Sequence, residues 1–155
     1  MTEAIASSAV ITAEELKATM IICYTEHGTT ARLCSKYRPP CPVYAITSSQ
    51  PTARICSGLS RGVHAMTIPD AEASIHVMRA AGQSHHDSVL NVLRDTLKEG
   101  KRLGYCDVGD YVIIIQGQAM GDDDFHASNT LEVRMISTAD LDERSVDASA
   151  VIVEE

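Results

Sequence analysis

The stretch "IICYTEHGTTARLCSKYRP", residues 21–39, joins an apolar run to a Gly-Thr-Thr turn and then to a helical pattern. Residues 20–25 predict a buried strand, and a helix is expected from about Thr29 to Lys36. Pro39 helps to end that helix, because proline disfavours helical backbone in the residue before it. A strand that opens through such a turn into a helix is where proteins often hold an anion. The stretch therefore predicts an α/β fold with a ligand-binding turn.

The candidate ligand-binding residues of this turn are Thr25, Glu26, His27, Gly28, Thr29 and Thr30. The first N–H groups of a helix lack partners, and the helix dipole makes that end positive. Threonine hydroxyls add hydrogen-bond donors, and glycine lets a phosphate approach the backbone. The pattern is neither a Walker loop, which needs a lysine before Ser or Thr, nor GxGxxG. A capped helix start that binds only water is the alternative.

The rest of the chain alternates between helical and strand patterns. Helices are expected over residues 2–18 (one or two), 49–60 and 84–103, and strands over 43–47, 62–68, 110–117 and 130–136. Residues 69–84 fit either a short helix or a structured loop. Ser49 is the expected N-cap of the second of these helices, and Gly104 follows the last one as a natural C-terminal glycine. This order predicts an α/β three-layer sandwich: a mixed sheet of about five strands, helices on both faces and a closing antiparallel hairpin.

Length and composition predict one globular domain. The chain has 155 residues, of which 45% are hydrophobic. Residues 1–136 form the expected domain, and 137–155 an acidic tail that is partly disordered or adds an edge strand. No apolar run reaches the ~20 residues of a membrane span, and no signal pattern opens the chain, so no membrane partner and a cytoplasmic location are expected. Five cysteines without a CxxC pair predict neither a disulfide framework nor a zinc site.

The charge is negative overall but locally basic. A net charge of −8 argues against a nucleic-acid partner. No acid lies between Glu26 and Asp70, where the sequence places Arg32, Lys36, Arg38, Arg54 and Arg61. This stretch suits an anionic ligand or an acidic partner surface. The alternative is a face that pairs with acids from elsewhere in the fold.

No residue set meets the demands of catalysis or metal binding. The acidic segment "GDDDFHASN", residues 121–129, has consecutive acids whose side chains point apart, so a solvated loop is expected. The adjacent His85 and His86 do not share a helix face and are expected at a helix start or on the surface. No general base or activated nucleophile is recognisable.

Several segments, in order, resemble the C-terminal α/β domain of pyruvate kinase. The segment "SKYRPPCPVYAITSSQPTARICSGLSRGVHAM" is similar to that domain's succession of YRP, CP, an AIT-type strand, a TAR helix and RGV. "TEAIASSAVITAEELKATMIICYTEHGTTARL" is similar to the helix and strand before it. "GYCDVGDYVIIIQG" and "HASNTLEV" resemble the closing hairpin. The resemblance covers residues 2–136.

The resemblance implies a regulatory and oligomerisation domain. Pyruvate kinase transfers phosphate from phosphoenolpyruvate to ADP with magnesium and usually potassium, in a catalytic barrel that this chain lacks. The implied partners are that barrel, the other subunits of a homotetramer and a sugar-phosphate effector, whose phosphate would sit at residues 25–30. No cofactor and no catalytic residue is expected in this chain. The alternative function is a free-standing sensor that binds phosphorylated metabolites.

Departures from the family bear on the effector. Family members that respond to fructose 1,6-bisphosphate often carry a basic or neutral residue where Glu26 stands. An aromatic residue and an arginine that hold the second phosphate are matched by His85 and Val92. The effector loop is matched by 117–129, which carries three aspartates at 122–124. Negative charge beside a bisphosphate is unfavourable, so weak or no binding of fructose 1,6-bisphosphate is expected, whereas a monophosphate remains compatible.

Overall fold

The computed structural model describes residues 1–67, 85–116 and 130–141, and the side chains of residues 85–90 are not described. The strands are β1 (Met20–Tyr24), β2 (Val43–Thr47), β3 (Val63–Thr67), β4 (Tyr111–Gln116) and β5 (Thr130–Met135). The helices are α1 (Thr2–Leu16), α2 (Thr29–Lys36), α3 (Gln50–Leu59), α5 (His85–Arg102) and α6 (Thr138–Leu141). Residues 2–18, expected to hold one helix or two, contain the single helix α1, which ends at Leu16. Residues 69–84, for which a short helix or a structured loop was expected, lie outside the described residues.

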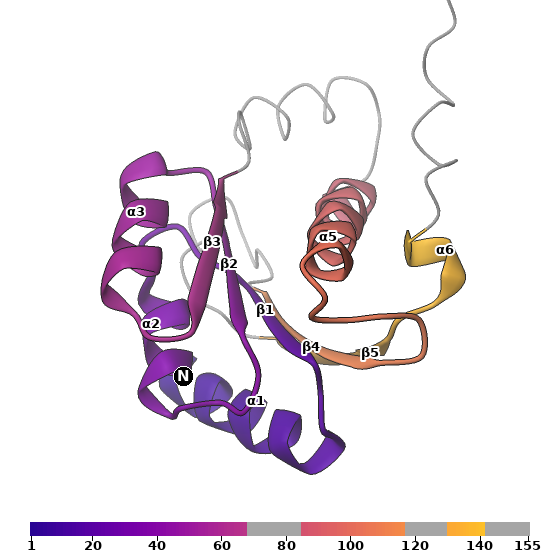
Figure 1. Ribbon diagram of the computed structural model, residues 1–155. Coiled ribbons are helices and arrows are strands. Elements are labelled where there is room, and N and C mark those ends of the chain that lie inside the picture. Colours follow the sequence, from indigo (N-terminus) through magenta and orange to yellow (C-terminus); the bar gives the residue numbers. More distant parts are fainter. Residues whose placement is uncertain (68–84, 117–129, 142–155) are drawn as a thin grey trace, which may run out of the picture.

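The strands form one sheet in the order β3-β2-β1-β4-β5 (Figure 1). The pairs β3–β2, β2–β1 and β1–β4 are parallel, and β4–β5 is antiparallel, with Tyr111 opposite Met135. Strands β1 and β4 are nearly continuous apolar runs because helices cover both faces of the sheet there. The predicted mixed sheet with a closing antiparallel hairpin is confirmed.

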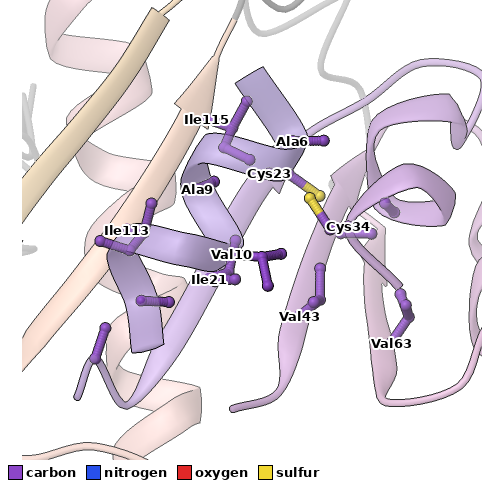
Figure 2. Close-up of a cluster of buried hydrophobic side chains, with 14 of the residues drawn as sticks. Ala6, Ala9, Val10, Ile21, Cys23, Cys34, Val43, Val63, Ile113 and Ile115 are labelled. Carbon is purple, nitrogen blue, oxygen red and sulfur yellow. The ribbon is translucent and has the colours of Figure 1, made fainter. Parts of the chain in front are cut away.

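Helices α1, α2 and α3 cover one face of the sheet (Figure 1). The buried residues of α1 are Ala6, Ala9, Val10 and Ala13, which share one side of the helix. Because three of them are alanines, the helix backbone can lie close to the strands. All four belong to one buried cluster with Ile21 and Cys23 of β1 and Ile113 and Ile115 of β4, and Figure 2 labels Ala6, Ala9 and Val10 of the helix within it.

Helix α5 covers the other face. Its Leu93 and Leu97 pack on every second residue of the strands, including Met20 and Ile22 of β1. The helix ends in a Schellman motif, in which the N–H of Gly104 donates to the carbonyl of Lys101 and the N–H of Tyr105 to that of Gly100. Gly104 has φ +77°, as expected of the glycine that terminates a helix.

The first residues of the segment expected to be an acidic tail, 137–141, are folded. Asp140 is 2% exposed and accepts hydrogen bonds from the N–H and hydroxyl of Ser137, at 2.9 and 2.6 Å. Arg134 of β5 pairs with the same carboxylate at 2.6 Å. Burial pushes the pKa of Asp140 up, but the bonds from Ser137 and Arg134 outweigh it and the pKa lies below its ordinary value. This arrangement fixes α6 against the end of β5.

Candidate functional site

The candidate turn lies at the carboxyl end of the central strand β1. The chain runs outward from β1 through β2 to β3 and then returns to the opposite side of β1 at β4. The strand order therefore reverses between β1 and β4. Open α/β sheets bind ligands beyond the carboxyl ends of their strands at such a reversal point. Residues 25–30 begin directly after β1 and occupy that position.

Gly28 turns the chain from the strand into α2. Its backbone has φ 77° and ψ 1°, in the left-handed region that glycine enters without steric cost. A Cβ at this position would lie 2.7 Å from the Sγ of Cys56 on α3. The Gly28 carbonyl accepts the N–H of Arg32 at 3.0 Å, the first hydrogen bond of α2. A larger residue would strain the turn and press it away from α3.

The beginning of α3 fixes the turn. The hydroxyl of Thr52 donates to the Glu26 carbonyl at 3.0 Å, and that of Thr47 approaches the same oxygen at 3.5 Å. The N–H of Thr25 donates to the Ile46 carbonyl at 2.9 Å, which extends the β1–β2 pairing. Sequence reasoning did not assign Thr47 or Thr52 to the site. Their positions at the end of β2 and in the first turn of α3 are the signal that could have identified them.

The six candidate residues differ in burial. Glu26, His27 and Thr29 are exposed, Thr25 is half-buried, and Gly28 and Thr30 are buried. Because Gly28 stands at the N-cap, no side-chain hydrogen bond caps α2. An anion here would meet backbone N–H groups of the first helical turn and the side chains of Thr29 and His27. The carboxylate of Glu26 is on the same turn and opposes the binding of negative charge.

The basic stretch of α2 and α3 is largely without ion-pair partners. Lys36 pairs with Glu3 of α1 at 2.6 Å, as the alternative of internal pairing expected. The remaining four make no ion pair in the described part of the chain: Arg32, Arg38, Arg54 and Arg61. Of these four, Arg32 in the first turn of α2 is near the candidate turn in sequence, whereas Arg38 and Arg61 follow the C-terminal ends of α2 and α3.

Metal and thiol chemistry find no support in the described residues. No group of three or more His, Cys, Asp or Glu side chains in residues 1–67, 85–116 and 130–141 is placed to hold a metal ion. The five cysteines are free thiols. Burial raises the pKa of Cys34 to about 12 and that of Cys41 to about 11, which keeps both protonated and unreactive. The acidic segment 121–129 lies outside the described residues, and His85 and His86 begin α5.

Within the described ranges, no helix has the length and apolar character required to cross a bilayer.

The fold and the turn define an open α/β domain with a strand–turn–helix unit at its reversal point. The family model described as "Pyruvate kinase, alpha/beta domain" matches residues 3–134, and the chain belongs to this family. The predicted resemblance is thereby confirmed.

Whole pyruvate kinases are among the relatives. A pyruvate kinase of Sporosarcina psychrophila is 37% identical over 122 residues, 79% of this chain and 18% of that protein. Pyruvate kinase 1 of Saccharomyces cerevisiae is 35% identical over 135 residues, 87% of this chain and 24% of that protein. The cytosolic isozyme of Nicotiana tabacum is 32% identical over 117 residues, 73% of this chain and 23% of that protein. The chain thus spans about a fifth of the length of these relatives.

Proposed function

We propose that this chain is the regulatory and oligomerisation domain of a pyruvate kinase, and that residues 25–30 bind the phosphate of an effector. The parent enzyme would transfer phosphate from phosphoenolpyruvate to ADP in glycolysis. The magnesium and potassium sites of that enzyme would lie in its catalytic barrel. The chain alone would not catalyse the reaction. A cytoplasmic location is supported by the tobacco relative, which is named a cytosolic isozyme.

One observation carries the effector proposal: the N-terminus of α2 lacks a side-chain cap and lies at the reversal point of the sheet. Uncapped N–H groups and a positive dipole suit a phosphate. Thr29 adds an exposed hydroxyl, and Arg32 adds positive charge one helical turn further on. The negative charge of Glu26 offsets part of this attraction for a phosphate. A sugar monophosphate therefore fits the turn better than fructose 1,6-bisphosphate, which carries a second charged group.

Thermal unfolding of the chain with phosphorylated sugars tests this proposal. A sugar monophosphate at about 100 times its dissociation constant should stabilise the native state by ~2.7 kcal/mol. Thr29→Ala should reduce the stabilisation, whereas Thr12→Ala, which removes a threonine from α1, should not. Inorganic phosphate and sulfate at matched ionic strength separate a general salt effect from binding. Equal stabilisation of both variants, or none of the wild type, would exclude the turn as the phosphate site.

The oligomerisation proposal rests on the edge strand β5. In the described part of the chain, β5 pairs with β4 on one side only. Its residues Val133 and Met135 are 41% and 57% exposed. A second copy could pair with this edge and bury both side chains.

Sedimentation at increasing concentration tests this proposal and should show self-association. Met135→Lys should abolish the self-association, whereas Ile55→Lys, on the exposed side of α3, should leave it intact. Persistent self-association of Met135→Lys would place the interface elsewhere.

A further inference from the structure

A cavity of about 440 Å³ lies between strands β2 and β3 and helix α5. Its polar walls are Tyr44 and His64 of the strands and Asp95 and Glu99 of α5, and Met66 and Leu103 add apolar surface. The cavity is on the α5 side of the sheet, whereas α2 and α3 cover the other side (Figure 1). Its volume falls within the range of small-molecule sites, roughly 300–1,000 Å³. The proposed phosphate site does not account for it.

Aromatic rings form one wall of this cavity. The rings of Tyr44 and His64 stack with centroids 5.5 Å apart and an interplanar angle of 26°. Tyr105, which follows α5, meets the same two rings at 5.5 Å from His64 and 6.2 Å from Tyr44. Its hydroxyl lies 3.5 Å from the Nε2 of His64. The electron-rich faces of tyrosine rings attract cations.

The hydroxyl of Tyr44 is a buried polar group that finds no hydrogen-bond partner among the described residues. Tyr44 is 3% exposed, and its hydroxyl makes no hydrogen bond to any residue that the structure describes. Burial raises the pKa of Tyr44 to about 12, so the hydroxyl stays protonated at neutral pH and can donate. Buried polar groups in folded proteins nearly always find partners. An acceptor atom of a bound molecule would supply one.

Carboxylates form the opposite wall. Asp95 and Glu99 lie four residues apart on α5 and therefore on the same side of the helix. Arg102 donates hydrogen bonds to both carboxylate oxygens of Glu99, each at 2.7 Å. These bonds hold the pKa of Glu99 below its ordinary value, so this carboxylate stays ionised. Asp95 makes no ion pair within the described residues. No lysine or arginine is among the described residues that line the cavity, and because Arg102 pairs with Glu99, the unpaired negative charge of this wall is that of Asp95.

We infer that this cavity binds a small organic cation, whose ammonium group lies between the Tyr44–His64 wall and the carboxylates of Asp95 and Glu99. Met66 and Leu103 contact the apolar part of the molecule. An oxygen atom of the molecule accepts a hydrogen bond from the Tyr44 hydroxyl. A ligand that carries its own carboxylate is disfavoured by the two acids, which separates this ligand class from amino acids. The site does not depend on the proposed phosphate site, because the two share no residue.

Titration of the chain with choline, followed by NMR or calorimetry at low ionic strength, tests the inference. Choline carries a cationic head and a hydroxyl oxygen, and 3,3-dimethylbutan-1-ol is its neutral counterpart of the same shape. Saturable binding of choline, with at least about tenfold weaker binding of the alcohol, is the expected result. Shifted resonances should belong to the cavity residues, including His64 and Met66. No saturable binding of choline, or equal binding of the two compounds, would overturn the inference.

Three variants locate the binding. Asp95→Asn and Glu99→Gln should each weaken choline binding by about fivefold or more, since each removes a charge from the wall. Glu14→Gln, on the opposite side of the sheet, removes the same charge and should leave binding unchanged. Tyr44→Phe should weaken binding without lowering the melting temperature, because the deleted hydroxyl makes no hydrogen bond to the described residues. Equal weakening by Asp95→Asn, Glu99→Gln and Glu14→Gln would show that only the overall charge attracts choline, and unchanged binding by Asp95→Asn, Glu99→Gln and Tyr44→Phe would show that choline binds elsewhere; either result would refute the site.

Discussion

Helices α2 and α3 begin beside each other and are built in opposite ways. Each follows the carboxyl end of a parallel strand, β1 for α2 and β2 for α3. The first turn of α3 is closed: the Ser49 hydroxyl accepts the N–H of Thr52 at 3.3 Å, and Pro51 has no N–H to satisfy. The first turn of α2 begins at Gly28, which has no side chain to cap it.

The difference shows how one helix start can support another. The hydroxyl of Thr52 donates to Glu26 and so holds the neighbouring turn in place. The exposed hydroxyl of Thr29, by contrast, makes no hydrogen bond within the described residues. The α3 start supports the neighbouring turn, whereas the α2 start, with the exposed Thr29 hydroxyl, is the proposed phosphate site. Mutations at the two starts should therefore affect different properties, stability at α3 and ligand affinity at α2.

The largest effect is expected from Gly28→Ala. The new Cβ would lie 2.7 Å from Cys56 Sγ in a left-handed backbone, so the free energy of unfolding should fall by about 2–3 kcal/mol. Urea denaturation measures this loss. Gly58→Ala in α3, where an added Cβ meets nothing within 4 Å, is the matched control and should be neutral or stabilising. Equal stability of the two variants would contradict the close packing of the turn on α3.

Thr29→Ala should reduce the affinity for a sugar monophosphate by about 1–3 kcal/mol, the cost of losing a hydrogen bond to a charged group. The melting temperature of the free protein should hardly change, because Thr29 is exposed. Calorimetric titration gives the affinity. A variant that loses stability but keeps its affinity would reverse the roles assigned to the two helix starts.

Ser49→Ala should give the opposite result. Removal of the cap should lower the free energy of unfolding by about 1 kcal/mol. Ser49→Asp keeps an acceptor for the Thr52 N–H and should retain most of the stability. Any loss of phosphate affinity in Ser49→Ala should be small and indirect, through the Thr52–Glu26 bond. Unchanged urea denaturation of Ser49→Ala would mean that the observed cap contributes nothing.

The smallest effect is expected from Glu26→Gln, which removes one negative charge from the turn. Affinity for the monophosphate should rise by about 1 kcal/mol, because an exposed charge a few ångströms away acts through water. The bonds from Thr47 and Thr52 reach the Glu26 backbone carbonyl, so they survive the substitution. Raising the salt concentration should reduce the gain. A gain that does not depend on salt would argue against an electrostatic cause.

The strands and helices could be predicted because local patterns determine them. The apolar runs of β1 and β4, the Ser49 cap and the glycine at 104 each carry a signal within a few residues. Whether residues 2–18 form one helix or two was harder to predict, because an alanine-rich sequence has a weak apolar pattern. The boundary of α1 is set by Lys17, which adopts a left-handed backbone with φ 53°.

The contacts between segments could not be predicted in the same way. Cys56 lies 28 residues from Gly28 in the sequence, yet its sulfur sets the space that the turn can occupy. Thr52 supports Glu26 only because the parallel pairing of β1 and β2 places their following turns side by side. The aromatic wall likewise brings together Tyr44 of β2, His64 of β3 and Tyr105 of the turn after α5. Such contacts depend on strand order and register, which a single sequence does not state.

Backbone amide NMR with a sugar monophosphate such as glucose 6-phosphate tests the central claim most directly. The amides of Thr29 and Thr30 at the start of α2 should shift in a saturable way as the ligand is added. The amide of Thr52 at the start of α3, already bonded to Ser49, should shift much less. Equal shifts at the two helix starts, or none at α2, would contradict the view that α2 is the open, phosphate-binding start.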